Sequence, residues 1–205
     1  MNMHLSQDQA DTLQELTNIA MGQAGSSLAQ ILNVFVELSI PQIRVVEAGK
    51  ILPAIAAMIP EHEQVTAVRQ AFYNRDQLRG EAISIFTQAG CSELATCMGY
   101  DSELAPREEQ ELLLDVSNIL SGAVLNGLAQ QLATDLGYSA PSIMAEQCSI
   151  DKVITPENMT WNYALMVGID FGIENKTFKC HQLILMAEES IKVLAQALDH
   201  FLESF

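Results

Sequence analysis

Hydrophobic residues recur at three- and four-residue steps in two long stretches of the chain, which is the pattern of a helix with one buried face. The first stretch starts at Ser6 or Asp8 as the N-cap and runs to about Asn33. Its inward positions are Leu13, Leu16, Ala20, Ala24, Leu28 and Ile31. In the second stretch, residues 108–134, the inward positions are Leu112, Val116, Ile119, Leu120, Ala123, Leu128 and Leu132. We expect two long helices that share one core.

Shorter runs of β-branched and aromatic residues indicate strands around these helices. We expect strands at 43–46, 65–73, 81–88, 163–173 and 178–187. Further helices are expected at 91–98, at 188–205 with Ile191, Leu194, Leu198 and Leu202 inward, and around Leu52–Met58. Residues 100–107 are polar and contain Pro106, as a linker does. The predicted fold class is α+β, an antiparallel sheet flanked by helices.

The two halves of the chain repeat each other when position n is compared with position n + 100. Identical pairs include Asn18 with Asn118, Gly22 with Gly122, and Pro41 with Pro141. We therefore expect one domain, residues 1–205, built of repeats 8–99 and 108–205 related by a pseudo-two-fold axis. An apolar repeat would indicate only a shared core. A repeated acid and amide in mid-helix indicates a surface that is used twice.

The repeated polar residues fall on one line of the first helix. Asp11, Glu15, Asn18, Gly22 and Gly25 have the spacing i, i+4, i+7, i+11 and i+14. An amide does not take up a proton at neutral pH, but it can hold a water molecule by donating and accepting hydrogen bonds. That property suits phosphoryl transfer to water, in which catalysis is mostly positioning.

The plainer interpretations of the same residues stay open. Asp11 and Glu15 are acids near a helix start, where they favour the helix dipole. Gly22 and Gly122 offer either a floor without side chains for another protein or a close contact between the two long helices.

The pattern Asp11-x3-Glu15-x2-Asn18-x22-Pro41 resembles the signature of the CheC/CheX/FliY phosphatases of bacterial chemotaxis. The second copy is an imperfect match, and it reads Glu111-x3-Asp115-x2-Asn118-x22-Pro141. Two copies make the chain similar to two-site CheC rather than to the one-site CheX. The resemblance implies a CheC-like fold and a hydrolase that removes the aspartyl phosphate of a CheY-type response regulator.

The same resemblance implies roles for individual residues. Asn18 and Asn118 would orient the attacking water, and Glu15 would contact the active-site Lys of the regulator, with Asp115 as its shorter counterpart. Asp11, Gly22, Glu111 and Gly122 would complete the partner-binding surface. Because Asp115 is one methylene shorter than Glu, and Glu111 stands where the signature has Asp or Ser, we expect the first copy to be the more active.

The resemblance also implies that the Mg²⁺ of the reaction belongs to the regulator, so the chain is expected to need no cofactor or metal of its own. The alternative is a non-catalytic binding module, FliM-like or CheD-binding. Retention of Glu15 and Asn18 favours the phosphatase, because a scaffold has no need of them.

The net charge of −16, from 26 acidic and 10 basic residues, argues against nucleic acid and anionic membranes as partners. The first thirty residues contain no Lys or Arg, and the sequence has no long uninterrupted apolar run, so we expect a cytoplasmic protein. The four Cys form no CxxC pair, and the four His lack ligand spacing, so no metal site is expected.

Overall fold

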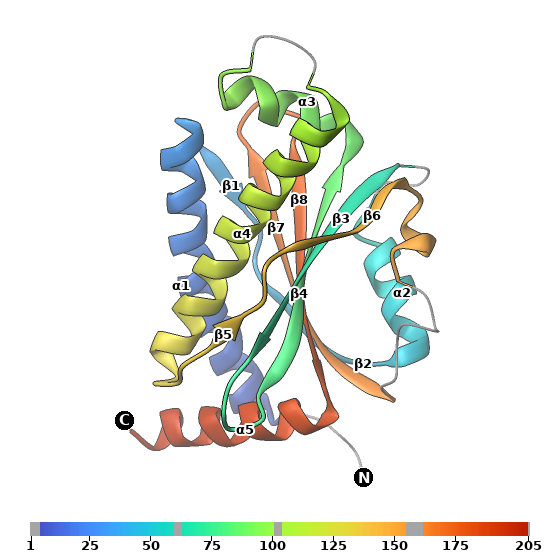
Figure 1. The fold of residues 1–205 in the computed structure, drawn as a ribbon. Helices are drawn as coiled ribbons and strands as arrows, with labels where there is room; N and C mark the ends of the chain where they lie inside the picture. Colours follow the sequence, from blue (N-terminus) through green and yellow to red (C-terminus); the bar gives the residue numbers. More distant parts are fainter. Residues whose placement is uncertain (1–4, 60–62, 101–103, 155–161, 205) are drawn as a thin grey trace.

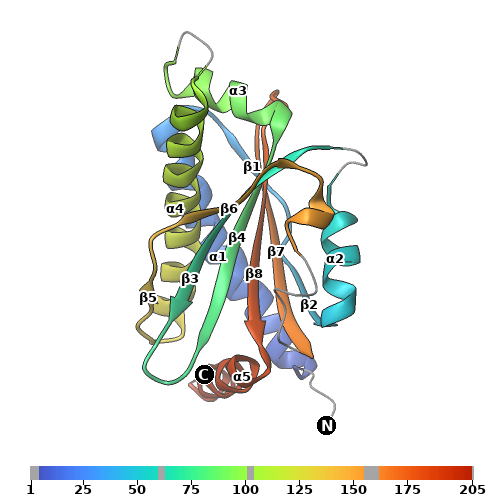
Figure 2. The same cartoon turned by 45° about the vertical axis from the view of Figure 1, so that its right-hand side comes forward.

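The computed structural model describes residues 5–59, 63–100, 104–154 and 162–204. An antiparallel sheet runs through the middle of the molecule (Figure 1). The long helices α1 (Gln7–Leu32) and α4 (Pro106–Gln131) lie side by side on one face of the sheet, and α2 (Ala48–Ala56) covers part of the other. Helices α3 (Gln88–Cys97) and α5 (Glu188–Glu203) lie at opposite ends of the sheet (Figure 2). The α+β prediction is confirmed.

The halves of the chain exchange edge strands. The centre of the sheet has the order β7-β8-β4-β3, formed by β3 (Val65–Tyr73), β4 (Arg79–Thr87), β7 (Tyr163–Ile173) and β8 (Lys179–Ala187). Strands β1 (Val36–Leu38) and β2 (Gln42–Glu47), from the first half, both pair with β7. Strands β5 (Gly137–Tyr138) and β6 (Ser142–Cys148), from the second half, both pair with β3. Each half therefore completes the sheet of the other.

The predicted helices and the long strands lie where the hydrophobic pattern put them, with ends shifted by a few residues. Helix α2 starts at Ala48, earlier than the Leu52 expected from the sequence, and continues through Pro53. Four of the described elements were not predicted from the sequence. Strands β1 and β5 and the 3₁₀ helix η1 (Ile150–Lys152) have only two or three residues, which is too few to show a period. The longer β6 was missed because its apolar and polar positions do not alternate. Pro60 and residues 101–103 of the expected linker lie outside the described residues.

Two hydrophobic cores form, one on each face of the sheet. The larger lies between the sheet and the α1–α4 pair, and the smaller lies between the sheet and α2. Two residues predicted to face inward are exposed instead, and three others are only half-buried. Ile31 is 46% exposed, because the buried stripe passes from Leu28 to Leu32 instead. Leu202 is 40% exposed, and Ile119, Ala123 and Leu132 are only half-buried.

Local sequence sets both helix starts. Ser6 Oγ accepts a hydrogen bond from the Gln9 backbone N–H, and Gln9 Oε1 accepts one from the Ser6 N–H, so a capping box opens α1. Pro106 occupies the first turn of α4, and Glu108 accepts from the N–H of Ala105. By length and composition α4 could cross a membrane, but 61% of its apolar window is buried against the rest of the protein, as in a core helix.

Candidate functional site

The first copy of the signature forms an open line of side chains along α1. Asp11, Glu15 and Asn18 are all exposed, and so is Gly22 at the next position of the line. The opposite side of the same helix carries the buried residues, from Leu13 to Leu32. Asp11 Oδ1 accepts a hydrogen bond from Gln7 Nε2 at 2.9 Å. Among the described residues, no hydrogen bond engages the side chains of Glu15 or Asn18, so both are free to meet a partner.

The second copy forms the corresponding line on α4. Glu111, Asp115 and Asn118 are exposed, and Gly122 is half-exposed. Glu111 pairs with Arg107 at 3.2 Å, but both side chains are mostly exposed, at 63% and 89%. Such a surface pair contributes little to stability. The ion pair does, however, engage Glu111, the acid at the start of the second signature.

The structure does not bring the two asparagines into one site. Helices α1 and α4 run antiparallel, since Gln131 Nε2 donates to the Leu16 carbonyl and Gly127 lies against Ala20. This register places Asn118 opposite residue 29 of α1, eleven positions from Asn18. At 1.5 Å per residue the separation along the helices is about 16 Å. The chain therefore carries two separate candidate sites.

The glycines of the line differ in their surroundings. A Cβ added at Gly22 or Gly122 would have no atom within 4 Å, so neither glycine serves the packing of the two helices. That contact is made at Gly127, where a Cβ would come within 2.8 Å of the Ala20 Cβ. Gly25 is not part of an open floor, because the Leu38 side chain of β1 covers it and would lie 3.0 Å from a Cβ added there. The surface without side chains is therefore limited to Gly22 in the first copy.

The asparagines also differ in their hydrogen bonds. Gln70 Nε2, on β3, donates to Asn118 Oδ1 at 3.0 Å and to the Ser139 carbonyl at 3.0 Å. Gln70 is only 3% exposed, while Asn118 lies at the surface. Gln70 was not among the residues predicted from the sequence to belong to the site. The sequence feature that could have indicated it is a polar amide at an inward-facing position of a strand, between Val68 and Phe72, which are both buried.

The spacing from the signature asparagine to the proline follows from the chain path after each helix. Ser39 donates its N–H to the Asp170 carbonyl, and its Oγ accepts from the Asp170 N–H at 3.0 Å. Ser139 makes the same two bonds to Ala71. In both copies the chain is thus tied to a strand of the central part of the sheet, β7 in the first copy and β3 in the second, and the proline follows two residues later.

The rims of the two copies, meaning the segments that follow α1 and α4, differ in the side chains that they expose. After α1 the chain exposes Phe35 by 79% and Ile40 by 73%. The corresponding positions after α4 are Asp135 and Ala140, and the exposed Asp135 lies four residues beyond Gln131, the last residue of that helix. An apolar rim with a large aromatic side chain is typical of a protein-binding surface.

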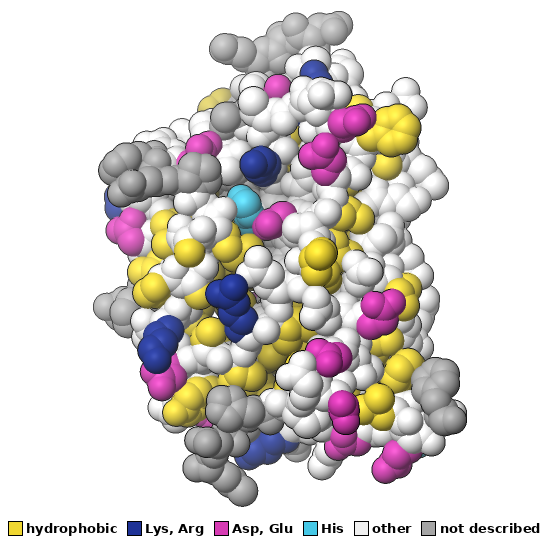
Figure 3. All heavy atoms as spheres, turned by 180° about the vertical axis from the view of Figure 1, so that it is seen from behind, with side chains coloured by type: hydrophobic (Ala, Val, Ile, Leu, Met, Phe, Trp, Pro, Cys, Tyr) yellow, Lys and Arg dark blue, Asp and Glu magenta, His cyan; other side chains and the backbone are white. Residues whose placement is uncertain are grey.

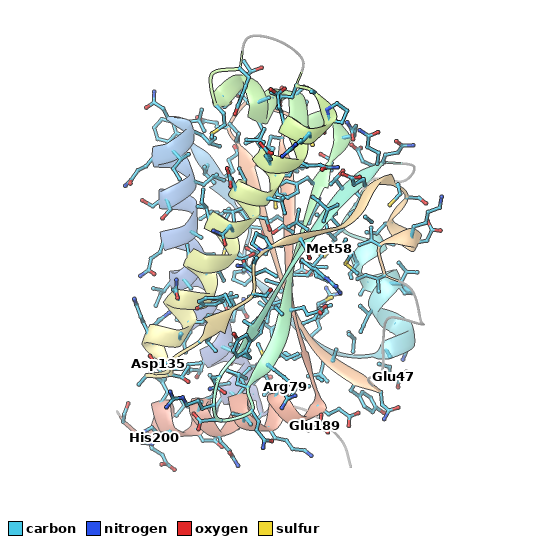
Figure 4. All side chains as sticks on the ribbon, viewed as in Figure 1. Glu47, Met58, Arg79, Asp135, Glu189 and His200 are labelled. Atoms are coloured by element: carbon cyan, nitrogen blue, oxygen red, sulfur yellow. The ribbon has the colours of Figure 1, made fainter. Side chains whose placement is uncertain are left out.

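The acidic side chains on the back of the molecule do not gather into one patch. On the face opposite α4, Asp and Glu side chains are spread out, with Lys and Arg side chains among them (Figure 3). Figure 4 labels Asp135 near the end of α4, and this acid contributes to the polar rim of the second copy. Among the described residues, no group of three or more His, Cys, Asp or Glu side chains is placed to hold a metal ion.

The two buried cysteines, Cys91 and Cys180, do not offer an alternative nucleophile. All four are free thiols. Burial, together with the charge of Glu109 and its hydrogen bond, raises the pKa of Cys91 to about 12. Burial and then the charge of Asp170 raise the pKa of the Cys180 thiol even further from its ordinary value. Buried thiols with raised pKa values stay protonated and unreactive.

Residues 9–43, which include the first signature, match the family model of the CheC-like family. The fold is similar to that of Thermotoga maritima FliY, with a TM-score of 0.69 and 18% identity, covering 97% of this chain and 100% of that chain. The FliM middle domain from H. pylori gives a TM-score of 0.63 at 15% identity, covering 94% and 99%. The chemotaxis protein CheX from Desulfovibrio desulfuricans gives 0.54 at 12%, covering 83% and 99%. At these identities the structures share the fold, and the resemblance to the CheC/CheX/FliY family seen in the sequence is confirmed.

Proposed function

We propose that this protein, which carries the CheC-like segment within a fold shared with FliY and CheX, hydrolyses the aspartyl phosphate of a CheY-type response regulator. The family match and the structural neighbours support a role related to chemotaxis. One observation carries the proposal further: Glu15 and Asn18 are exposed, unengaged by other described side chains, and followed on the same line by the bare surface at Gly22.

The proposed mechanism assigns separate tasks to these residues. Asn18 accepts a hydrogen bond from the attacking water and so directs the water's lone pair at phosphorus. A bond forms between the water oxygen and phosphorus, the P–O bond to the regulator's aspartate breaks, and the carboxylate is released. Both hydrogens of the water stay with the inorganic phosphate, which leaves as H₂PO₄⁻, so Asn18 takes up no proton. Glu15 binds the active-site Lys of the regulator and fixes the pose. The Mg²⁺ that the acyl phosphate needs is bound by the regulator.

The surroundings of Asn18 support a protein substrate rather than a small molecule. The residue lies on an open helix face, and the apolar Phe35 and Ile40 are exposed on the segment that follows. Aromatic and aliphatic anchors of this kind contribute much of the binding energy in protein interfaces. We propose that the regulator docks over α1 and this rim.

The test is the decay of a phosphorylated CheY-type regulator from the same organism, with and without this protein. We expect acceleration by the wild type. In Asn18→Ala the rate should fall by about 100-fold at the first copy, because a misplaced water costs about that much. Asn118→Ala and the double variant measure the contribution of the second copy.

Binding to a regulator with a stable phosphate mimic should survive Asn18→Ala. If binding and turnover fall together, the water-orienting role is wrong.

A second candidate function is a non-catalytic binding module. The observation in its favour is the shared fold with the FliM middle domain. A FliM-like module, or one that binds a CheD-type deamidase, would leave the phosphate lifetime of every cognate regulator unchanged. In that case Asn18→Ala would be silent, whereas substitution of the exposed Phe35 by Ser would weaken binding.

A further inference from the structure

A buried amide links the sheet to the second asparagine. The two Gln70 N–H groups go to different acceptors, Asn118 Oδ1 and the Ser139 carbonyl, each at 3.0 Å. A backbone carbonyl only accepts hydrogen bonds, so the end of Gln70 that faces Ser139 must be its NH₂ group. The atom of Asn118 that receives the other N–H must then be its oxygen. The Asn118 amide is thereby held with its oxygen inward and its NH₂ outward.

The first copy has no equivalent of this link. In the pairing of the edge strands, Gln42 lies opposite Gly168, and Ser142 lies opposite Arg69. Residues 42 and 142 correspond in the repeat, so Gly168 corresponds to Arg69. The next residue after Gly168 is Ile169, which therefore stands where Gln70 stands in the other half. Ile169 is fully buried and offers no hydrogen bond.

We propose that Gln70 is a positioning residue that restrains Asn118 and makes the second copy the weaker site. The inference rests on the proposed phosphatase function. A water molecule is directed at phosphorus when the amide oxygen accepts one of its hydrogens, since its lone pair is then left for the attack. An amide that presents its NH₂ group instead donates to that lone pair and competes with the reaction.

The restraint is maintained by burial. If Asn118 rotated its oxygen outward, one N–H of the buried Gln70 would lose its partner. Gln70 Oε1 already lacks a hydrogen-bond partner among the described residues. A second unmade bond on the same buried amide is unfavourable, so the outward-oxygen conformer of Asn118 is depleted. Asn18 has no such restraint, because an isoleucine lies at the position equivalent to Gln70.

The test uses the substitution that the first copy already contains, Gln70→Ile. In an Asn18→Ala background only the second copy remains, and we expect Gln70→Ile to raise kcat by about 3- to 10-fold, the population shift set by one hydrogen bond. KM should change little, because the docking surface is untouched.

The gain should require Asn118 and be absent from the Asn118→Ala background. An unchanged or lower kcat in Asn18→Ala/Gln70→Ile overturns the proposal. Gln70→Met, which keeps the length of the side chain, is the second variant should the isoleucine impair folding.

A measurement without turnover separates this inference from the proposed function. In an ¹⁵N spectrum of the full chain, the Gln70 side-chain NH₂ signals should exchange slowly with water and shift strongly in Asn118→Ala. If the Gln70 side-chain signals keep their chemical shifts in Asn118→Ala, the hydrogen bond is absent, whatever the activity. If the wild type fails to accelerate dephosphorylation while the signals do respond, the hydrogen bond exists, and the phosphatase proposal is wrong together with the positioning role of Gln70 in that reaction.

Discussion

Replacing Gly127 by alanine should loosen the contact between the two long helices. The added methyl would lie 2.8 Å from the Ala20 Cβ, 3.0 Å from the Ala20 Cα and 2.9 Å from Gln23 Oε1. The end of Gln23 can swing away, but Ala20 is a short side chain on a helix and cannot. Helices α1 and α4 must therefore separate slightly to admit the methyl group.

The magnitude follows from a matched pair of variants. Any Gly→Ala change in a helix interior gains about 0.8–1 kcal/mol of intrinsic helix propensity. Gly22 is the control, since its Cβ would meet nothing within 4 Å. The gain is common to both variants and cancels in their difference. What remains is the cost of overpacking at Gly127, about 1–3 kcal/mol. Gly22→Ala should thus be more stable than the wild type, and Gly127→Ala should be less stable than Gly22→Ala by that amount.

Urea unfolding of both variants, followed by far-UV circular dichroism, measures the two free energies. The comparison requires equal m-values, so that a change in midpoint reports a change in stability. Equal midpoints for Gly22→Ala and Gly127→Ala would refute the assignment of Gly127 to the helix contact. A lower midpoint for Gly22→Ala would mean that Gly22, not Gly127, is the packed glycine.

Two further predictions concern ionisable groups. Burial alone would raise the pKa of Glu93, but hydrogen bonds from the β7–β8 turn and the charge of a nearby lysine hold it below its ordinary value of 4.5. Its contribution to stability is therefore present above pH 4.5 and lost as the pH falls through the folded-state value. Glu93→Gln should lower the Tm at pH 7 more than at pH 3, and the opposite order would contradict the sign. In the folded protein at pH 8, a thiol reagent should leave Cys91 and Cys180 unlabelled and should label the half-buried Cys97. Rapid labelling of Cys180 in the native protein would contradict its burial.

The hydrophobic period was sufficient to predict the framework of the fold. Leu13, Leu16 and Leu28 repeat at helical spacing and lie in the core, because a long helix can bury only one face. The period failed most clearly near helix ends, where predicted inward residues are exposed. At Ile31 and Leu202 two apolar residues compete for the last inward position, and the outcome depends on what the neighbouring elements cover.

The candidate site, like the fold, was determined partly by the sequence and partly only by the tertiary structure. The sequence alone determined that Asp11, Glu15 and Asn18 share one line of a helix, since that requires only their spacing, and the structure places that line on the exposed side. It left open whether Gly22 faced a partner or the other helix. Only the tertiary structure decided this, and only it showed Leu38 over Gly25 and Gln70 beneath Asn118. The physical reason is that a helix face is set by local periodicity, whereas these contacts join elements far apart in the chain, across a sheet whose halves exchange edge strands.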